Sequence, residues 1–285
     1  MSQNPKRLHT AWHNRLLRIV LVIAAALVAL LFLLLPLAVV FVEALSKGLQ
    51  FYFQQIAKPD TVSAIKLSIK LALVAVPLNM IFGIAAAWVI TKFEFRGKRL
   101  LISFIDLPFT VAPVISGLVW VLIFGMQGWL GPFFRAHNIE ILFAFPGMLL
   151  AILFVTFPFV ARELIPLMQQ QGTEEEEAAV SLGANFRQVF FRVTLPNIKI
   201  GLVYGILLSN ARALGEFGAI SLVSGMLRGS TVTMPLEVEI LFNEYNAAGA
   251  FVVASLLSLS ALLTLLVRSL LEYRHNRRQP ELPSE

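Results

Sequence analysis

Six long stretches of apolar, almost uncharged residues set the first constraint on this sequence. A helix needs roughly 20 such residues to cross the hydrocarbon core of a bilayer. Charged residues make up 14% of the 285-residue chain, against about 25% in a soluble domain, so a water-facing globule of this length could not hide the apolar surface. We therefore predict an all-α, polytopic membrane protein with six transmembrane helices, at residues 19–42, 71–90, 100–124, 139–160, 201–223 and 247–267.

The first apolar run, residues 19–42, follows basic residues, as the core of a signal peptide also would. A signal-peptide core has only about 7–15 residues, so the length of this run favours a retained transmembrane helix. On this interpretation residues 1–18 are an N-terminal tail and residues 60–271 are a core of five spans. Residues 272–285 are polar and contain proline, and we expect a disordered C-terminal tail.

The basic residues lie outside the apolar runs and predict the orientation of the chain. They flank the first and last runs, and the segment 92–99 (KFEFRGKR) holds four of them, whereas the connection 125–138 holds one. Loops rich in Lys and Arg stay in the cytoplasm. Both termini, residues 92–99 and the connection 161–200 are therefore expected to be cytoplasmic. This distribution accounts for the net charge of +6 better than a nucleic-acid-binding face does.

The sequence offers little chemistry of its own. It contains no cysteine, and its four histidines lie outside the apolar runs. The lack of cysteine excludes disulfides, Cys-ligated metals and a thiol nucleophile. Because no nucleophile, base or set of metal ligands converges in the spans, we expect no catalytic site and no metal site, and a membrane-embedded enzyme is disfavoured.

The connection 161–200 contains four consecutive glutamates and then a glycine-punctuated amphipathic segment. Thr173 is a good N-cap and Glu176 stands three residues later, which predicts a capping box with the glutamates in the first turn of a helix. Gly183 suits the position that ends this helix. Asn185 and Gln188 can cap a second helix, which we expect Pro196 to stop just before the fifth span. Such a helix pair in a water-exposed loop is typical of a docking element.

Two other functions of this helix pair are disfavoured by its charge. Amphipathic helices often lie in the membrane interface, but four glutamates would be repelled by an anionic cytoplasmic leaflet. A helix-turn-helix that reads DNA is improbable because the acidic helix would repel phosphates.

The loop resembles the signature E-A-A-x-x-x-G-x9-[IV]-x-L-P of ABC importer permeases. The resemblance implies the type I ABC importer permease fold and a coupling loop, residues 173–196, seated in a cleft of an ATPase subunit. No G-x-x-x-x-G-K-[ST] motif occurs, so the chain is not expected to be an enzyme or to bind a cofactor, and ATP would be bound by a partner. The seven fixed positions of the signature are all present: Glu177, Ala178, Ala179, Gly183, Val193, Leu195 and Pro196.

Two further segments, residues 45–98 and 215–251, resemble the W-type permeases of sulfate and thiosulfate importers, and the similarity extends over nearly all of residues 35–271. This resemblance implies import of sulfate or thiosulfate through the bacterial inner membrane. It implies as partners two ATP-binding subunits, a second homologous permease subunit, an extracytoplasmic sulfate-binding protein and membrane lipid, with no nucleic acid.

The residues alone do not select the anion. Apart from Arg212 and backbone amides the spans offer few donors for a tetrahedral dianion. A homodimeric molybdate or tungstate permease is therefore the nearest alternative. An ion-coupled secondary transporter is more distant, because that class tends to show inverted repeats and acidic or histidine residues at the membrane midplane.

Arg212 and Glu216 lie within the predicted fifth span, four residues apart, and are expected on one face of one helix. A charge at the bilayer centre costs roughly 2.5–3.5 kcal/mol on insertion scales, so such residues are normally paired and face the bundle interior. They either neutralise each other and join two helices, or line the translocation pathway, or both lie outside the hydrocarbon. Asp106 lies about six residues into the third span from its cytoplasmic end, which favours an interfacial or helix-packing role over a binding one.

Overall fold

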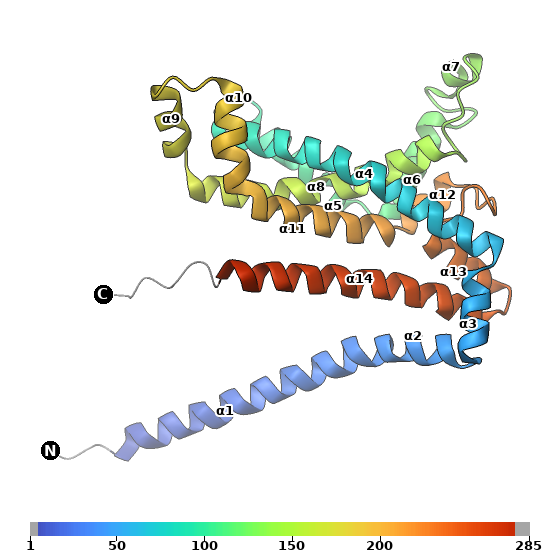
Figure 1. Ribbon diagram of the computed structural model, residues 1–285, viewed down its shortest axis with the longest axis horizontal. Helices are drawn as coiled ribbons and strands as arrows, with labels where there is room; N and C mark the ends of the chain where they lie inside the picture. Colours follow the sequence, from blue (N-terminus) through green and yellow to red (C-terminus); the bar gives the residue numbers. More distant parts are fainter. Residues whose placement is uncertain (1–4, 277–285) are drawn as a thin grey trace.

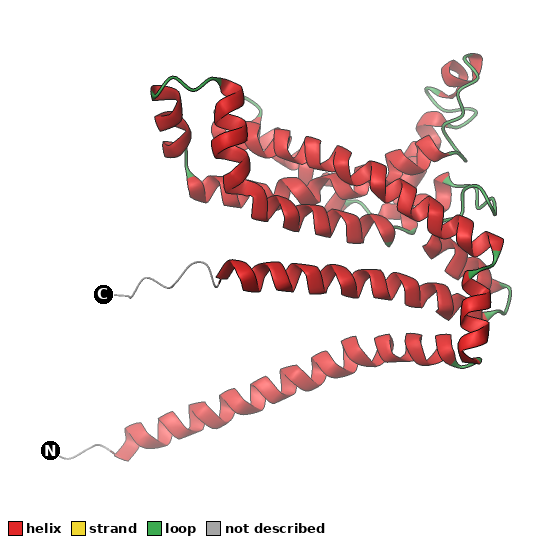
Figure 2. Ribbon diagram, viewed as in Figure 1, coloured by secondary structure: helices red, strands yellow, loops and turns green. Residues whose placement is uncertain are grey.

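The computed structural model describes residues 5–276, and the side chains of residues 17–273. In this part of the chain every regular element is a helix (Figure 2). The helices are α1 Pro5–Ala29, η1 Leu30–Leu34, α2 Leu35–Leu45, α3 Gly48–Ile56, α4 Pro59–Lys92, α5 Lys98–Thr110, α6 Pro113–Phe124, α7 Gly131–Ala136, α8 Phe145–Gln171, α9 Glu174–Ser181, α10 Phe186–Val189, η2 Phe190–Thr194, α11 Leu195–Leu214, α12 Gly218–Val223, α13 Met234–Asn243 and α14 Ala247–Asn276.

Within the described residues, five helices are long and apolar enough to cross a membrane, and a sixth span exists if α5 and α6 count together. The predicted number of spans is thus reached with one broken span. The break between α5 and α6 bends the chain by 107°. Val111 and Ala112 are extended there, because a residue that precedes proline, here Pro113, is pushed out of the helical region. The five continuous candidates are Leu17–Leu45, Pro59–Lys92, Phe145–Gln171, Phe186–Leu214 and Ala247–Tyr273.

The boundaries of the spans differ from the sequence prediction at several points. The first helix begins at Pro5, inside the predicted tail 1–18, and α14 continues to Asn276 inside the predicted tail 272–285. The fourth span begins at Phe145, because residues 139–144 form a loop that α8 follows with a proline in its first turn. The remaining parts of the two predicted tails, residues 1–4 and 277–285, lie outside the described residues.

The predicted fifth span, residues 201–223, is wrong at both ends. The helix already begins at Phe186 and runs through Pro196 to Leu214, while Gly218–Val223 form the separate short helix α12. A proline inside a helix lacks an N–H group and clashes with the carbonyl four residues earlier. The wider π turn η2 precedes Pro196 and accommodates it, with the Leu195 N–H donating to the Phe190 carbonyl.

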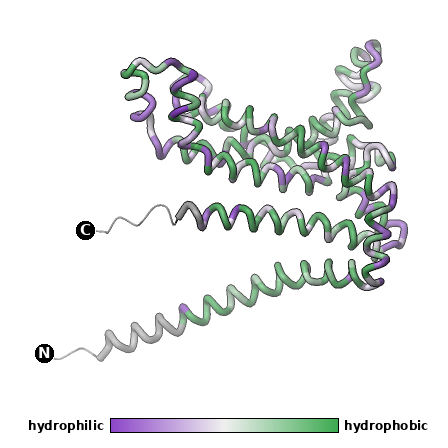
Figure 3. The backbone as a smooth tube through the Cα atoms, viewed as in Figure 1, coloured by the Kyte–Doolittle hydropathy of each residue, from purple (hydrophilic) through white to green (hydrophobic). Residues whose placement is uncertain are grey.

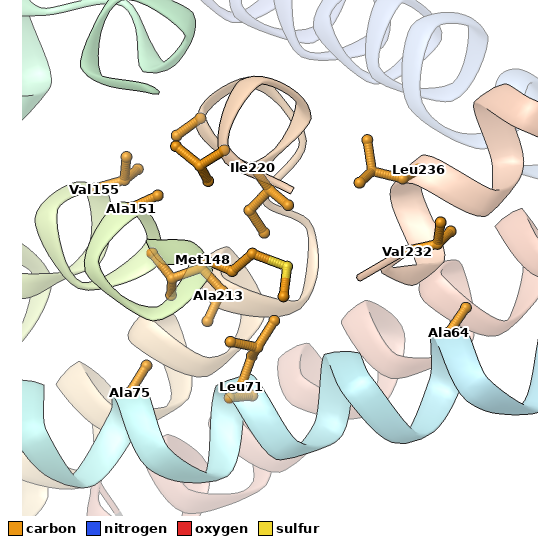
Figure 4. Close-up of a cluster of buried hydrophobic side chains, with 14 residues drawn as sticks. Ala64, Leu71, Ala75, Met148, Ala151, Val155, Ala213, Ile220, Val232 and Leu236 are labelled. Carbon is orange, nitrogen blue, oxygen red and sulfur yellow. The ribbon is translucent and has the colours of Figure 1, made fainter. Parts of the chain in front are cut away.

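Helices α4, α8 and α11 pack side by side and form the core of the bundle (Figure 1). A buried cluster joins them to α12: Leu71 and Ala75 come from α4, Met148 from α8, Ala213 from α11 and Ile220 from α12 (Figure 4). Small residues allow this close approach, as is usual between membrane helices. A Cβ atom on Gly83 of α4, for instance, would lie 2.5 Å from the Val160 Cβ of α8.

The two ends of the bundle are distinct (Figure 1). The start of α1, the junction between α4 and α5, the α9–α10 pair and the end of α14 lie at one end, and α3, α7 and α13 lie at the other. This is the grouping that the distribution of basic residues predicts. Figure 3 shows hydrophilic residues gathered at α9 and α10, while the long helices are mostly hydrophobic.

Candidate functional site

The first candidate site is the loop between α8 and α11, which contains two helices joined by a tight turn. The Gly183 N–H donates to the Val180 carbonyl and the Ala184 N–H to the Ala179 carbonyl, so α9 ends in a complete Schellman motif. Gly183 has a φ of 89°, a left-handed conformation in which any other residue would be strained. The prediction that Gly183 ends this helix is confirmed.

The capping interactions of the two helices are only partly as predicted. Asn185 and Gln188 form a capping box, in which each side chain accepts from the other residue's backbone N–H at 2.8 and 3.0 Å. The predicted box of Thr173 and Glu176 is wrong. The Thr173 hydroxyl instead donates to Glu177 Oε1 at 2.6 Å, because the carboxylate of Glu176 is engaged elsewhere.

The signature residues fall into two groups in the structure. Leu195 packs against the buried cluster that contains Ile198, and Pro196 lies in the first turn of α11. These two residues therefore belong to α11 and its packing in the bundle. The others lie on α9, at its C-terminal turn and at η2. A shallow groove of about 330 Å³ opens among them, next to Leu182, whose side chain is 90% exposed. The groove is lined by Ala179, Leu182, Gly183, Ala184, Gln188, Arg192 and Val193.

Glutamates of α9 fix the loop to the bundle. Glu176 Oε2 lies 3.0 Å from Lys92 Nζ of α4, and its Oε1 accepts from the Thr194 hydroxyl at 2.6 Å. Asn197 of α11 donates to the carboxylate of Glu175. The acidic run is thus explained by local ion pairs and hydrogen bonds as well as by its place at the start of a helix.

Aromatic rings make a second connection between the loop and α4. The ring of Trp88 stacks on Phe186 with centroids 4.8 Å apart and lies 5.4 Å from Phe190. Sequence reasoning missed Trp88, Lys92 and Thr194 as parts of this site. Trp88 and Lys92 are four residues apart and share one face of α4, but nothing in that spacing reveals that the face meets a loop about 90 residues later.

The second candidate site is the pair Arg212–Glu216, and the structure brings these residues together. Arg212 Nη2 lies 2.7 Å from Glu216 Oε2, and Glu216 Oε1 accepts from the Ala219 N–H at 2.8 Å. Glu216 is fully buried, whereas the Arg212 side chain is 31% exposed. The expectation of one continuous helix is wrong, because α11 ends at Leu214 and Glu216 lies in the connection to α12. The pair therefore holds two helices together at a break in the chain.

Buried polar side chains join the three core helices one turn of α11 before this pair. Asn79 Nδ2 of α4 donates to Thr156 Oγ1 of α8 at 2.7 Å and to Ser209 Oγ of α11 at 3.1 Å. All three residues are buried. Hydrogen bonds of this kind stabilise contacts between membrane helices.

Of the two roles expected for Asp106, interfacial or helix packing, the structure shows a contact between helices. Its Oδ1 lies 2.9 Å from Arg162 Nε, which connects α5 to α8, and the Arg162 guanidinium lies 4.4 Å above the ring of Phe109. Both charged side chains are partly exposed, so this ion pair contributes little to the free energy of unfolding.

At the opposite end of the bundle, α13 carries a buried carboxyl group. Burial raises the pKa of Glu237 above its usual range, and the charge of Arg228 opposes this shift. Arg228 itself forms an ion pair with Glu244 at 2.7 Å. Within the described residues, no group of three or more His, Cys, Asp or Glu residues is arranged to hold a metal ion.

Comparisons with known proteins place these features in context. Residues 79–277 match the family described as binding-protein-dependent transport system inner membrane component. The sulfate transport system permease protein CysW of Escherichia coli strain K12 is 49% identical over 259 residues, which cover 91% of this chain and 89% of that protein.

Two different permeases of one organism are also similar to this chain. In Synechococcus elongatus, the sulfate transport system permease protein CysW is 48% identical over 87% of this chain and 86% of its own length. The sulfate transport system permease protein CysT of the same strain is 37% identical over 85% of this chain and 87% of its own length.

Solved structures share the fold. A bacterial ABC transporter involved in the import of the acidic polysaccharide alginate matches with a TM-score of 0.75 at 15% identity, over 96% of this chain and all of the matched chain. A bacterial alginate ABC transporter in complex with an alginate pentasaccharide-bound periplasmic protein matches with a TM-score of 0.73 at 16% identity, over 95% and 98%. At these identities the likeness shows the fold alone.

Proposed function

The chain belongs to the binding-protein-dependent transport system inner membrane component family, and from this premise we propose that it is the permease subunit of an ATP-driven importer of sulfate or thiosulfate. Relatives that carry the name sulfate transport system permease are 48–49% identical to it over most of its length. That identity, together with the fold of an ABC importer permease, is the observation that carries the proposal.

The loop 173–196 would be the contact with the ATPase. Its two helices are held rigidly by a Schellman motif and a capping box, while the groove beside Gly183 and the side chain of Leu182 face outward. An ordered, exposed element with a small groove of mixed polar and apolar lining suits contact with a partner protein. The chain has no phosphate-binding motif of its own, so ATP and its hydrolysis belong to two partner subunits, and no cofactor is assigned to the chain.

The relatives and neighbours also suggest the remaining partners. Two different sulfate permeases occur in Synechococcus elongatus, and this chain is more similar to one of them, which favours a heterodimer with a second permease of the other type. A neighbour of the same fold binds a periplasmic protein loaded with its substrate. We expect an extracytoplasmic sulfate-binding protein to dock in the same general way.

The proposed orientation rests on the proposed contact of the loop with the ATPase. With the loop 173–196 on the ATPase side, the start of α1 and the end of α14, which lie at the same end of the bundle, would be cytoplasmic, and the end with α7 and α13 would be extracytoplasmic, in the bacterial inner membrane. Arg212 would lie along the anion path, held in place by the buried carboxylate of Glu216. Its partial exposure is consistent with a group that meets a passing anion while its charge stays balanced.

The composition of the assembled complex tests this proposal most directly. The tagged chain is purified from its own membranes in mild detergent, and the proteins that accompany it are identified. An ATPase together with a second, different permease supports a heterodimeric sulfate importer. An ATPase with this chain as the only permease would favour a homodimeric molybdate or tungstate importer. A preparation that lacks both yet still takes up sulfate would contradict the proposal.

Variants of the loop test its contact with the ATPase. Gly183→Glu introduces a strained residue and a charge beside the groove, so we expect at least about a tenfold loss of sulfate uptake, the scale of a coupling free energy of 1–3 kcal/mol. Gly97→Glu is the matched control, because Gly97 also has a positive φ, of 99°, and open space around it, but lies between α4 and α5, outside the loop 173–196. Equal uptake by the two variants would show that the loop is not the contact.

A further inference from the structure

Lys92, the last residue of α4, is bonded into the loop rather than lying free among the basic residues of segment 92–99. Its Nζ lies 3.0 Å from Glu176 Oε2, and its side chain is only 9% exposed. The same ammonium group donates to the Gly172 carbonyl at 2.5 Å, at the C-terminal end of α8. Lys92 therefore contacts the beginning of the loop and the first turn of α9 at once.

The carboxylate of Glu176 extends this contact to the other end of the loop. Its second oxygen accepts from the hydroxyl of Thr194, a residue that is 2% exposed and is the last residue of the π turn η2. One carboxylate thus connects the end of α4, the start of α9 and the turn that leads into α11. Glu176 lies beside the signature residue Glu177 and is not itself one of the fixed positions of the signature.

The covalent chain alone does not provide this connection. The loop is continuous with α8 and α11. By contrast, α4 ends at Lys92, and the chain then leads into α5 and not into the loop. A displacement of α9 would reach α8 and α11 through the backbone. It would reach α4 only through noncovalent contacts. These are the packing of α4 against α8 and α11 in the core and the direct contacts of α4 with the loop, which are the Lys92–Glu176 ion pair, the bond from Lys92 to Gly172 and the rings of Trp88, Phe186 and Phe190.

The surroundings of the ion pair decide whether it can transmit such a displacement. An exposed ion pair is weak and changes geometry easily, since water screens it. The side chains of Lys92 and Glu176 are 9% and 17% exposed, so their attraction acts in a lower dielectric and is stronger. By contrast, Lys98 and Glu94 form an ion pair in the same region in which the glutamate is 88% exposed.

We propose that Lys92, Glu176 and Thr194 form a bridge that couples α4 to the ATPase-contacting loop, so that all three core helices move when the loop is displaced. They are positioning residues, which act through the loop and touch neither ATP nor the transported anion. The inference rests on the proposed contact of the loop 173–196 with an ATPase. It assigns a role to one residue outside the loop and to two inside it that the signature does not include.

The test measures anion uptake per ATP hydrolysed by the whole complex in proteoliposomes. Lys92→Glu places two carboxylates together and should lower this ratio about tenfold, within the usual range of coupling free energies. Glu176→Lys should have a similar effect. The double variant Lys92→Glu/Glu176→Lys restores the ion pair but not the bond to Gly172, so we expect it to recover to within about threefold of the original ratio. Lys98→Glu is the matched control and should leave the ratio unchanged.

A second pair of variants keeps the test decisive if charge reversal prevents assembly. Thr194→Val replaces the hydroxyl by a methyl group at nearly constant size, whereas Thr194→Ser retains the hydroxyl and loses the methyl group. The bridge requires a lower uptake-to-hydrolysis ratio in Thr194→Val than in Thr194→Ser. A purely structural role would lower the yield of the complex and leave the ratio the same in both.

Two results would overturn the inference. One is a Lys92→Glu complex with the same ratio as Lys98→Glu, and the other is a double variant that couples no better than the single ones. Failure of the proposed function would look different, because the original complex would then contain no ATPase or would show no dependence of uptake on ATP. In a complex that does couple, the variants report on the bridge alone.

Discussion

The first transmembrane helix and α8 differ in a way that composition does not foresee. Leu17–Leu45 is the more apolar of the two, yet none of its most apolar stretch is buried within the chain, whereas half of the corresponding stretch of Phe145–Gln171 is buried. The first helix contacts the rest of the chain mainly through α2, which packs against α14, and α1 diverges from the bundle (Figure 1).

The contrast indicates what determines which helices of a membrane protein pack together in its core. Lipid is as apolar as a leucine side chain, so an apolar helix gains little by leaving lipid for protein. Helix contacts come instead from small residues that permit close packing and from polar residues that bond across helices. In α4, α8 and α11 these are Gly83 and Gly205, which both approach Val160, and the bonded set of Asn79, Thr156 and Ser209.

The largest effect is expected at the buried charge of the core. Arg212→Ala removes the partner of Glu216 and leaves a carboxylate that is fully buried. Breaking a buried pair in this way costs about 3–5 kcal/mol, and we expect the lower end because Arg212 is partly exposed. The free energy of unfolding, measured in detergent micelles titrated with sodium dodecyl sulfate, should fall accordingly. Glu216→Gln is the control, since it removes the charge together with the need for a partner, and equal losses in both would refute the argument.

An intermediate effect is expected where α4 meets α8. Gly83→Leu places a side chain where even a Cβ lies 2.5 Å from Val160, and such overpacking costs roughly 1–3 kcal/mol. Ala85→Leu is the same kind of change two residues later on an exposed face of α4 and should be nearly neutral. The free energy of unfolding of the two variants is compared by the same titration with sodium dodecyl sulfate. If Ala85→Leu were as destabilising, size alone and not the helix contact would explain the result.

The smallest effect is expected in the first helix. Leu31→Ala changes a side chain that is 56% exposed, so we expect a change within about 0.5 kcal/mol of the unfolding free energy. Leu164→Ala, at a fully buried position of α8, leaves a cavity and should cost about 2 kcal/mol or more. A loss at Leu31 as large as that at Leu164 would break the comparison and would show that a partner chain packs on the first helix.

The sequence predicted the number of spans and the turn between the two loop helices, because both depend on local properties. A long uncharged run crosses a membrane regardless of its neighbours, and the Asn185–Gln188 capping box and the Gly183 turn are formed by residues at most five positions apart. The seven residues of the signature likewise lie in one segment. For these features, residue type and spacing are sufficient.

The predictions that were wrong concern places where a local pattern competes with a distant contact. Thr173 and Glu176 have the spacing of a capping box, but Lys92 and Thr194 attract the carboxylate of Glu176 more strongly. Pro196 looks like a helix stop, yet the π turn before it lets the helix continue. The residues that bind Glu176 and the π turn that precedes Pro196 are not part of the local pattern, so the spacing alone does not reveal them.

The sequence by itself determined that the chain is an all-helical membrane protein whose loop 173–196 contains two short helices, because apolar length, basic flanks and capping spacing act over short distances. The tertiary structure decided that α4, α8 and α11 form the core and that the most apolar helix stays outside it. It also decided that Lys92 joins the loop, that Arg212 and Glu216 meet across a helix break, and that Asn79 reaches two other helices. These contacts join residues on different elements, and in lipid no general hydrophobic force would have indicated which elements meet.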